Sequence, residues 1–468
     1  MAHPPADATR VPLAFRGGLV GALAPFACFL AGVTWLALSG APDEKGFWPV
    51  LVAALTVGLL LARDRAAYAD ALLEGMSDRL VMLMVCAWLF AGVLGSVLSA
   101  SGLVAALARV ARDVGMTGGW YVGAVFAICC LVSTATGTSF GTILVCGPLL
   151  YPPGGAVGAV PAALMGAILA GATFGDSISP ISDTTIASSG SQEVDIGGTV
   201  RRRLALALPA GAMALITSIA LGGGGAVSVA AANTAPSASL RALWMLLVPA
   251  AVLVLLMRQR HLIEGLLLGV LGAVMLALVL QLLAPHDLVR IDRARFLATG
   301  VVLEGMQRAV GVSVFTLLLV GLVGGTRAAG VLDRLATAIR SDRTRSAPRA
   351  EWTIVSMVTG AVLLTTHSVV AILSVGPVAS QVGAAAGLDG YRRANLLDVT
   401  VCTWPFLLPY FLPPILAASA SQAGAPYGMP AVSAWQAGLH NSYAWALLLM
   451  LAVAIVTGYG RRASSPAS

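Results

Sequence analysis

Charged residues are scarce in this chain of 468 residues: 10% are Asp, Glu, Lys or Arg, whereas 58% are hydrophobic. A soluble domain carries about 25% charged and about 45–50% apolar residues, and the mean hydropathy here is +0.88. These values exclude a soluble globular protein and indicate a polytopic membrane protein. Because one membrane-spanning helix takes about 20 apolar residues, the length leaves no room for a sizeable soluble domain.

Lysine is almost absent, since Lys45 is the single lysine among 28 basic residues, and the arginines lie mainly in short loops between apolar runs. No stretch combines clustered basic residues with interleaved aromatic ones, so the net charge of +7 does not indicate a nucleic-acid partner. Such arginines instead set the orientation of membrane spans. The six cysteines lie in apolar stretches without CxxC spacing, which favours packed small hydrophobes over disulfides or metal ligands.

Two apolar runs, 119–151 and 352–382, are too long for one straight helix and are interrupted by small polar residues. Each run either crosses the membrane once with a break, or enters and leaves on one face as a re-entrant hairpin. With two hairpins and a cytoplasmic N-terminus, 20 of the 28 basic residues fall on the cytoplasmic side, which the positive-inside rule favours. We therefore expect an all-α integral membrane protein of the cell inner membrane. It has about ten transmembrane helices plus two re-entrant hairpins, and both termini are cytoplasmic.

A pattern also repeats at an interval of about 230 residues. Leu-Glu-Gly-Met occurs at 73–76 and again at 303–306, and a Gly-Pro pair near the end of each hairpin occurs at 147–148 and 376–377. A polar-interrupted span follows in each half, with Asp176 in the first and Asp398 in the second. Because five spans separate the two starts, the halves have opposite orientation, as in secondary transporters.

The expected organisation has six parts. They are a cytoplasmic tail (1–16), leading transmembrane helices (17–66), a first inverted repeat (67–225), connecting transmembrane helices (226–296), a second inverted repeat (297–460) and a cytoplasmic tail (461–468).

The densest polar cluster, residues 171–189, continues directly from an apolar run. A charge at membrane depth costs about 2.5–3.5 kcal/mol on insertion scales, so Asp176 and Asp183 should face a cavity, a partner or an ion. Pro180 removes a backbone donor, which predicts an unwound segment between the two carboxylates. The freed oxygens are hard ligands that suit Na⁺ or a proton carrier. The alternative is a surface loop at a helix end, where Asp and Ser only cap the helix.

The tip of the first hairpin, residues 136–142, has glycines that permit a tight turn and hydroxyls that satisfy the backbone in an apolar setting. It also matches the pattern GxSxG. A nucleophile elbow needs a strand-to-helix turn and triad partners, which this context does not supply, so we expect no catalysis by Ser139 and no enzyme. We favour the hypothesis that a cation binds between this tip and the unwound segment.

The run FGDSISPISDTT (174–185) and the tip TGTSFGT (136–142) together resemble the NhaC family of Na⁺/H⁺ antiporters. This resemblance implies an inner-membrane exchanger whose ion sites lie at hairpin tips and broken helices. It also implies that Asp176, Asp183 and the threonines 184–185 bind the cation or proton.

The order of elements resembles that family from about Phe47 to Tyr459, but the second half departs from its pattern. After the pair Trp404-Pro405, Phe406 stands where the family has Asn. Related members carry malate, lactate or amino acids.

We therefore expect Na⁺/H⁺ exchange, with Na⁺ bound by ionised Asp176 and Asp183 and released when they are protonated. The further candidate ligands of the first half are Thr136, Gly137, Thr138, Ser139, Ser177, Ser179, Thr184 and Thr185. A second-half site comprises Thr366, His367, Ser368, Asp398 and Thr400. His367 is either a group that titrates with cytoplasmic pH or a satisfied hydrogen-bonding residue.

The alternative function is Na⁺- or H⁺-coupled transport of an organic anion of the malate or lactate type, or of an amino acid, on the same scaffold. A passive structural membrane protein gives no reason for the two buried carboxylates. No cofactor is expected. The expected partners are Na⁺, H⁺ and the lipid bilayer, and a homodimer is left open.

Overall fold

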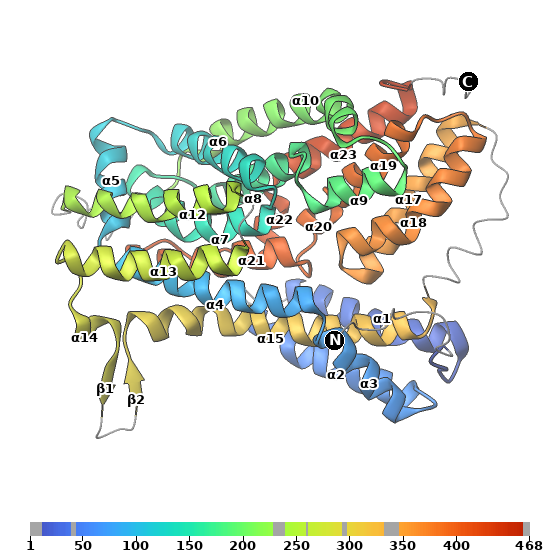
Figure 1. The fold of residues 1–468 in the computed structure, drawn as a ribbon, viewed down its shortest axis with the longest axis horizontal. Helices are drawn as coiled ribbons and strands as arrows, with labels where there is room; N and C mark the ends of the chain where they lie inside the picture. The colour runs from blue at the N-terminus through green and yellow to red at the C-terminus, as the bar shows by residue number, and fades with distance from the viewer. Residues whose placement is uncertain are drawn as a thin grey trace.

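The computed structural model describes residues 12–38, 44–227, 239–258, 261–292, 297–331 and 346–461. Within these ranges the chain is almost entirely α-helical (Figure 1). Eight of the described helices are long and apolar enough to cross a membrane, or nine if one bent pair counts as a span. This confirms the multi-pass, all-α class. The expected ten spans exceed this number because four further apolar helices have only 10–17 residues.

The elements are named in chain order. The helices are α1 (Gly18–Leu38), α2 (Phe47–Leu61), α3 (Arg65–Met76), α4 (Arg79–Ala100), α5 (Leu103–Asp113), α6 (Gly118–Thr136), α7 (Ser139–Leu150), α8 (Pro161–Ile178), α9 (Asp183–Ser191), α10 (Ile196–Gly222), α12 (Leu247–Met257), α13 (Leu262–Val279), α14 (Pro285–Leu288), α15 (Val301–Ala328), α17 (Ala347–Thr365), α18 (Ser368–Ala385), α19 (Gly390–Val401), α20 (Trp404–Leu407), α21 (Leu412–Ser421), α22 (Ala434–Leu439) and α23 (Ser442–Thr457). The strands β1 (Arg290–Asp292) and β2 (Leu297–Thr299) form one antiparallel pair.

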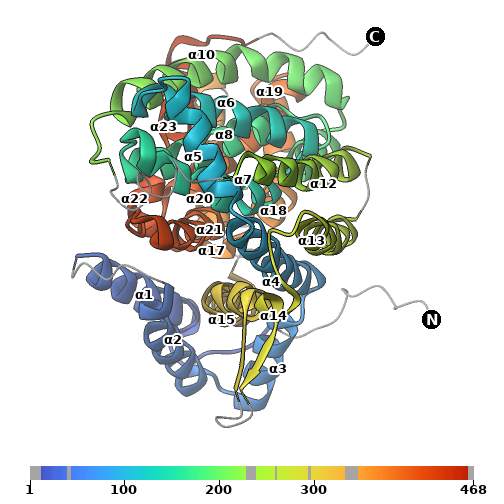
Figure 2. The same cartoon turned by 90° about the vertical axis from the view of Figure 1, so that its left-hand side faces the viewer.

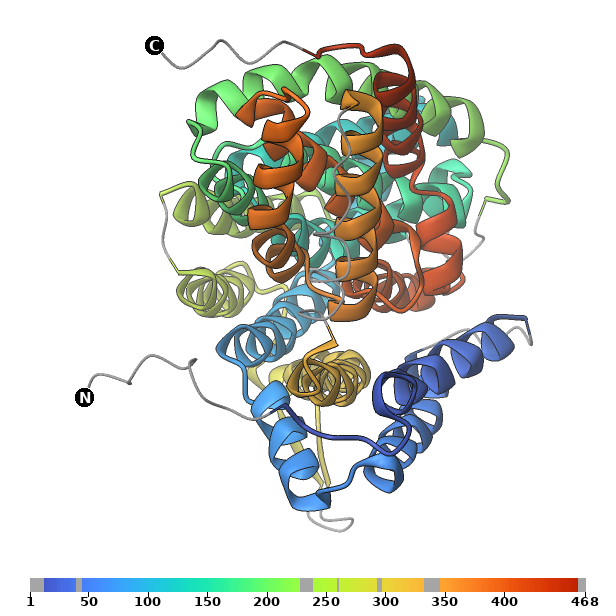
Figure 3. The same ribbon diagram turned by 90° about the vertical axis from the view of Figure 1, so that its right-hand side faces the viewer.

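The helices form two groups, which the end-on views separate (Figures 2 and 3). In the smaller group α15 packs against α1, α2 and α3, and α4 joins this group to the larger one by contacting both α15 and α7. In the larger group α8 is surrounded by α6, α7, α10, α21 and α23. Accordingly 78% of the apolar window in the span Pro161–Ser191 is buried, against 33% of that in α10. The polar cluster of the sequence therefore lies in the centre of the larger group.

Four helix breaks interrupt the bundle. The first separates α6 from α7 at Gly137, whose φ is +66°, and the second lies between α8 and α9 at residues 179–182. The third separates α17 from α18 at Thr366, whose φ is +52°, and the fourth lies between α20 and α21 at residues 408–411. Each break lies within a stretch that the sequence interrupts with polar residues or proline.

The helix boundaries recur at an interval of 229 residues. Helix α17 has the length of α6 and begins 229 residues after it, and the same interval separates the starts of α8 and α19 and the breaks 179–182 and 408–411. In this register Asp176 corresponds to Pro405 and not to Asp398. Asp176 and Asp398 therefore both lie in interrupted spans but not at corresponding positions, since Asp398 corresponds to Leu169 in this register. The expected tails 1–16 and 461–468 lie mostly outside the described residues.

Candidate ion-binding site

A cavity of about 150 Å³ lies where the helix breaks meet. All four breaks, or the residues next to them, contribute to its wall. The polar residues that line it are Thr138, Ser139, Asp176, Asp183, Thr184, Thr366, His367 and Ser368, and the apolar ones include Trp88, Pro405, Phe406 and Phe411. A water molecule occupies about 30 Å³ in the liquid, so the cavity has room for several waters or for a partly hydrated ion.

The break between α8 and α9 follows from its local sequence. Pro180 lacks an N–H and cannot continue α8, and Ser179 ends the helix with its amide donating to the Asp176 carbonyl, 3.2 Å away. The Ser179 hydroxyl donates to the Thr134 carbonyl at 2.9 Å, which ties the break to the end of α6. A Cβ atom at Gly137 would lie 2.6 Å from the Ile181 side chain. The first tip and the break between the carboxylates therefore pack directly on each other.

Asp176 is buried at 7% exposure, and its Oδ1 has no hydrogen-bond partner among the residues that the structure describes. The hydroxyl of Ser139, also in the cavity wall, has none either. A buried polar group without a partner costs free energy, more so when it is a carboxylate. A cation or a proton in the cavity would satisfy both oxygens.

Asp183 differs from Asp176 because solvent reaches it. It is the first residue of α9, and its Oδ1 accepts a hydrogen bond from the Thr184 amide at 2.9 Å. The hydroxyls of Ser182 and Thr184 are 3.1 Å apart. The N-terminus of α9 carries a partial positive charge that favours a carboxylate. The site thus pairs an accessible carboxylate with an enclosed one.

The donor set fits a hard monovalent cation better than a transition metal. The described residues contain no group of three or more His, Cys, Asp or Glu that could hold a metal ion. The polar wall contains two carboxylates, several hydroxyls and one imidazole, from Asp176, Asp183, Thr138, Ser139, Thr184, Thr366, Ser368 and His367. Oxygen ligands of this kind suit hard cations.

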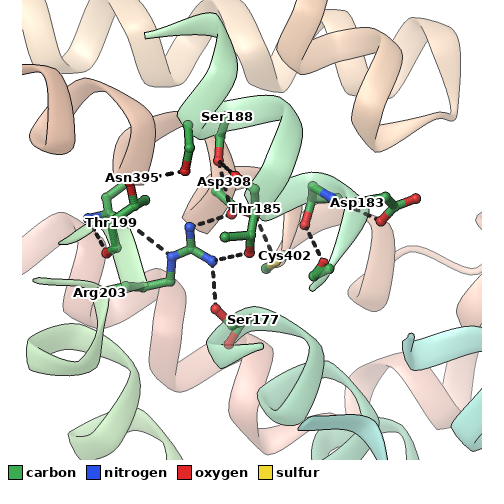
Figure 4. Close-up of polar contacts among 12 residues, drawn as sticks. Ser177, Asp183, Thr185, Ser188, Thr199, Arg203, Asn395, Asp398 and Cys402 are labelled. Carbon is green, nitrogen blue, oxygen red and sulfur yellow. Dashed lines mark hydrogen bonds and ion pairs between the residues drawn. The ribbon is translucent and has the colours of Figure 1, made fainter. Parts of the chain in front are cut away.

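A second buried network lies beside the cavity (Figure 4). Arg203 of α10 is 1% exposed and forms an ion pair with Asp398 of α19, which is 0% exposed. Its Nη1 donates to the Ser177 carbonyl at 2.6 Å and to the Thr185 hydroxyl at 2.9 Å. Its Nε donates to Asn395 Oδ1 at 2.9 Å. Ser177, Thr185 and Asp398, all candidate ligands in the sequence, therefore belong to this network and do not line the cavity.

Arg203 and Arg392, which the sequence places next to apolar runs, are buried in the protein. Both lie inside helices, and Arg392 is 6% exposed with its Nε donating to Glu351 at 2.8 Å. The positive-inside rule counts arginines by their position between apolar runs. It does not register that Arg203 lies in the second turn of α10 and points into the bundle.

The remaining candidates have structural partners of their own. The hydroxyls of Thr136 and Thr400 donate to the carbonyls of Val132 and Leu396, at 2.8 Å and 2.7 Å, within their own helices. Gly137 forms the left-handed end of α6. None of the three lines the cavity.

Two residues of the network, Asn395 and Cys402, belong to no motif in the sequence, whereas Ser188 belongs to the polar cluster 171–189. Ser188 donates to Asp398 Oδ2 at 3.2 Å, and the Cys402 thiol lies 3.6 Å from Asp398 Oδ1. Asn395 and Cys402 stand three residues before and four residues after Asp398. Such spacing places them on one face of a helix, a signal that could have grouped them with Asp398.

Fold and site together define a multi-pass α-helical membrane protein with a carboxylate cavity at helix breaks. Residues 18–223 match the Na⁺/H⁺ antiporter family, which confirms the resemblance that the two motifs carry. Over 167 residues the chain is 32% identical to the Na⁺/H⁺ antiporter NhaC of Alkalihalophilus pseudofirmus, which covers 35% of this chain and 36% of that protein.

Two relatives come from Bacillus subtilis. The malate-2H⁺/Na⁺-lactate antiporter is 28% identical over 235 residues, which are 49% of this chain and 50% of that protein. The Na⁺/H⁺ antiporter NhaC is 29% identical over 159 residues, 31% and 34% of the two chains. The chain thus spans between about a third and a half of the length of these curated relatives. The similarity is to transporters rather than to enzymes.

Proposed function

We propose that this protein exchanges Na⁺ for H⁺ across a membrane through a site shared by Asp176 and Asp183. The observation that carries the proposal is the carboxylate of Asp176, which is buried beside the cavity with Oδ1 unpartnered among the described residues. The similarity to Na⁺/H⁺ antiporters over residues 18–223 supports the choice of ions.

The mechanism is competition for the same oxygens. Na⁺ enters past the accessible Asp183 and binds between the ionised carboxylates, with hydroxyl oxygens of Thr138, Ser139 and Thr184 completing its ligands. A proton that binds a carboxylate removes the negative charge and one ligand, so Na⁺ leaves. The site therefore holds either Na⁺ or the proton, but not both. Because one ion leaves when the other binds, the two ions are transported in opposite directions.

Alternating access requires that the cavity open to each side in turn. We place α6–α7 and α17–α18 as re-entrant hairpins in two inverted repeats, and the 229-residue interval of their helix boundaries supports this arrangement. The bias of 20 of the 28 basic residues supports cytoplasmic termini in the inner membrane.

The test is an exchange assay in proteoliposomes that report internal pH. Na⁺, Li⁺ and K⁺ are added in turn, and we expect Na⁺ to release protons from vesicles that contain the native chain. Asp176→Asn and Asp183→Asn should each abolish the response. The exposed pair Arg109–Asp113 supplies a matched control, because Asp113→Asn removes a carboxylate far from the cavity. Exchange that persists in Asp176→Asn would refute the shared-carboxylate mechanism.

A second candidate is coupled transport of a small organic anion. His367 favours it, because this residue lines the cavity with a buried Nδ1 that has no partner among the described residues, and an imidazole N–H can donate a hydrogen bond to a carboxylate. The match with the malate-2H⁺/Na⁺-lactate antiporter over half of the chain points the same way. Uptake of labelled malate or lactate driven by a Na⁺ gradient, and lost in His367→Ala while Na⁺/H⁺ exchange persists, would support it. Absence of uptake in the native chain would exclude these two substrates.

A further inference from the structure

The Arg203–Asp398 ion pair lies wholly inside the protein, at 1% and 0% exposure. Removing two charges from water costs several kcal/mol per ion, and such a pair is favourable only when further hydrogen bonds satisfy both groups. Most of that condition is met here. Nε and Nη1 of Arg203 have three acceptors, and Asp398 accepts a hydrogen bond from Ser188 at 3.2 Å, whereas Nη2 of Arg203 has only the ion pair with Asp398 among the described residues.

The guanidinium also bridges the break that separates the two site carboxylates. Nη1 of Arg203 donates to the Ser177 carbonyl at the end of α8 and to the Thr185 hydroxyl at the start of α9. One side chain of α10 therefore holds both half-helices at once. Asn395 of α19 accepts from Nε and donates from Nδ2 to the Thr199 carbonyl of α10 at 3.1 Å, so α19 is fixed to the same point (Figure 4).

Three carboxylates and the guanidinium of Arg203 determine the charge around the cavity. Asp398 lies within electrostatic range of both Asp176 and Asp183, so three carboxylates, two of them buried and one accessible, interact with one another. Arg203 neutralises Asp398, which does not line the cavity. Two negative charges remain for the exchanged ions.

We infer that Arg203 is a positioning residue and a permanent counter-charge. It keeps Asp398 out of the exchanged-ion site and fixes the two half-helices of the broken span, so that Na⁺ and H⁺ bind on Asp176 and Asp183 alone. This inference rests on the proposed Na⁺/H⁺ exchange and adds to it which carboxylates carry the ions.

The test compares Arg203→Gln, Asp398→Asn and the double variant in proteoliposomes. The number of protons exchanged per Na⁺ is obtained from the reversal potential, and the half-saturating Na⁺ concentration from initial rates. Arg202→Gln is the matched control, because Arg202 is the neighbouring arginine and its ion pair with Asp389 is partly exposed, at 31% and 14%.

Arg203→Gln leaves Asp398 without a counter-charge, so an additional proton or Na⁺ should enter and the proton-to-Na⁺ ratio should change. Asp398→Asn leaves a positive charge beside the site, so the half-saturating Na⁺ concentration should rise more than about tenfold, equivalent to about 1.4 kcal/mol. The double variant should restore the native ratio. The Arg202→Gln control should keep native values throughout.

A folded double variant that exchanges with a changed ratio, or that binds Na⁺ without exchanging it, would show that Asp398 carries an exchanged ion and would overturn the inference. Arg203→Lys keeps the charge but loses the planar fork. It must therefore retain the native ratio even where its turnover falls, and a changed ratio in this variant also contradicts the inference. If the native chain itself shows no Na⁺/H⁺ exchange, the proposed function fails instead, so the two failures are distinguishable.

Discussion

The two broken spans of the protein have the same backbone plan and opposite chemistry. The break at 179–182 reads Ser-Pro-Ile-Ser, and the break 229 residues later, at 408–411, reads Leu-Pro-Tyr-Phe. Both have proline as the second residue, which ends the preceding helix in each half. Helix interruption and ion binding are therefore separable, because proline produces the bend and the neighbouring side chains determine what the bend can bind.

Burial follows the same division. Every residue of the second break except Leu408 is buried, whereas Pro180 and Ile181 of the first are exposed. Tyr410 packs in a T-shaped arrangement on Phe29 of α1, with ring centroids 5.8 Å apart. In the second half the positions of Asp176 and Asp183 are occupied by Pro405 and Leu412, which line the apolar wall of the cavity. At these two breaks the first half thus supplies carboxylate oxygens and the second half apolar packing.

The charged groups of the two halves differ in their partners as well. Glu351 of the second half is 0% exposed and lies between two arginines: its Oε1 accepts from Arg392 Nε at 2.8 Å and its Oε2 from Arg461 Nη2 at 2.6 Å. Asp176 of the first half has an unpartnered oxygen among the described residues. The comparison predicts that neutralising Glu351 damages the fold, whereas neutralising Asp176 damages only ion binding.

The largest expected effect on stability is that of Glu351→Gln. Removing one partner of a buried ion pair costs about 3–5 kcal/mol, because the other charge is left uncompensated. Thermal unfolding in detergent should show a clear fall in the midpoint, while exchange per folded molecule stays native. A midpoint equal to that of the native chain would show that the ion pairs of Glu351 with Arg392 and Arg461 do not stabilise the fold. The contrast between Glu351 and Asp176 would then be wrong.

Asp176→Asn should have the next largest effect, and it should appear only in the presence of Na⁺. A ligand at 100 times its Kd stabilises the folded state by about 2.7 kcal/mol, so Na⁺ should raise the midpoint of the native chain but not that of the variant. Without Na⁺ the variant should be at least as stable as the native chain, because an unpaired buried charge has been removed. Choline chloride is the control for ionic strength. A Na⁺-dependent shift that survives in Asp176→Asn would place the cation elsewhere.

Much of this site follows from local sequence alone. Pro180 marks the break correctly, and the two carboxylates on either side of it do line one cavity with the Thr138-Ser139 tip. A helix break is a local event, and a proline within an apolar run is enough to indicate it. The re-entrant path of the hairpins stays a prediction.

The Arg203 network could not be predicted in the same way. Arg203 meets Asn395 and Asp398 across about 190 residues, and this contact exists only because α10 packs on α19. The local sequence around Arg203 does not indicate this contact. The sequence also does not show that Asp176 and Asp398 occupy different positions in their spans, because only the helix boundaries reveal the two registers.

The two tips sharpen the comparison further, beginning with Gly137→Ala. The φ of Gly137 is +66°, and an added Cβ would lie 2.6 Å from Ile181 Cγ1 and 3.0 Å from the Ile181 carbonyl. A non-glycine residue in this region costs about 1–3 kcal/mol. We expect the free energy of unfolding in detergent to fall by about 2 kcal/mol. Na⁺ binding should also weaken, because the displaced segment lies between the two site carboxylates. Gly190→Ala is the matched control, since its Cβ would meet nothing within 4 Å. Equal effects of the two substitutions would contradict the direct packing of tip and break.

The smallest effect, and one of opposite sign, is expected at the other tip. Thr366 stands 229 residues after Gly137 and adopts φ +52°, a conformation that is an outlier for a β-branched residue. Thr366→Gly relieves that strain but raises the conformational entropy of the unfolded chain. We therefore expect the free energy of unfolding to rise by up to about 1 kcal/mol, which is measured as a higher thermal midpoint. Thr365→Gly, at the last residue of α17, should instead destabilise by about 1 kcal/mol, because it removes a buried side chain whose hydroxyl donates to the Ala361 carbonyl. A loss in Thr366→Gly as large as that in Thr365→Gly would mean that the threonine side chain is needed at the tip.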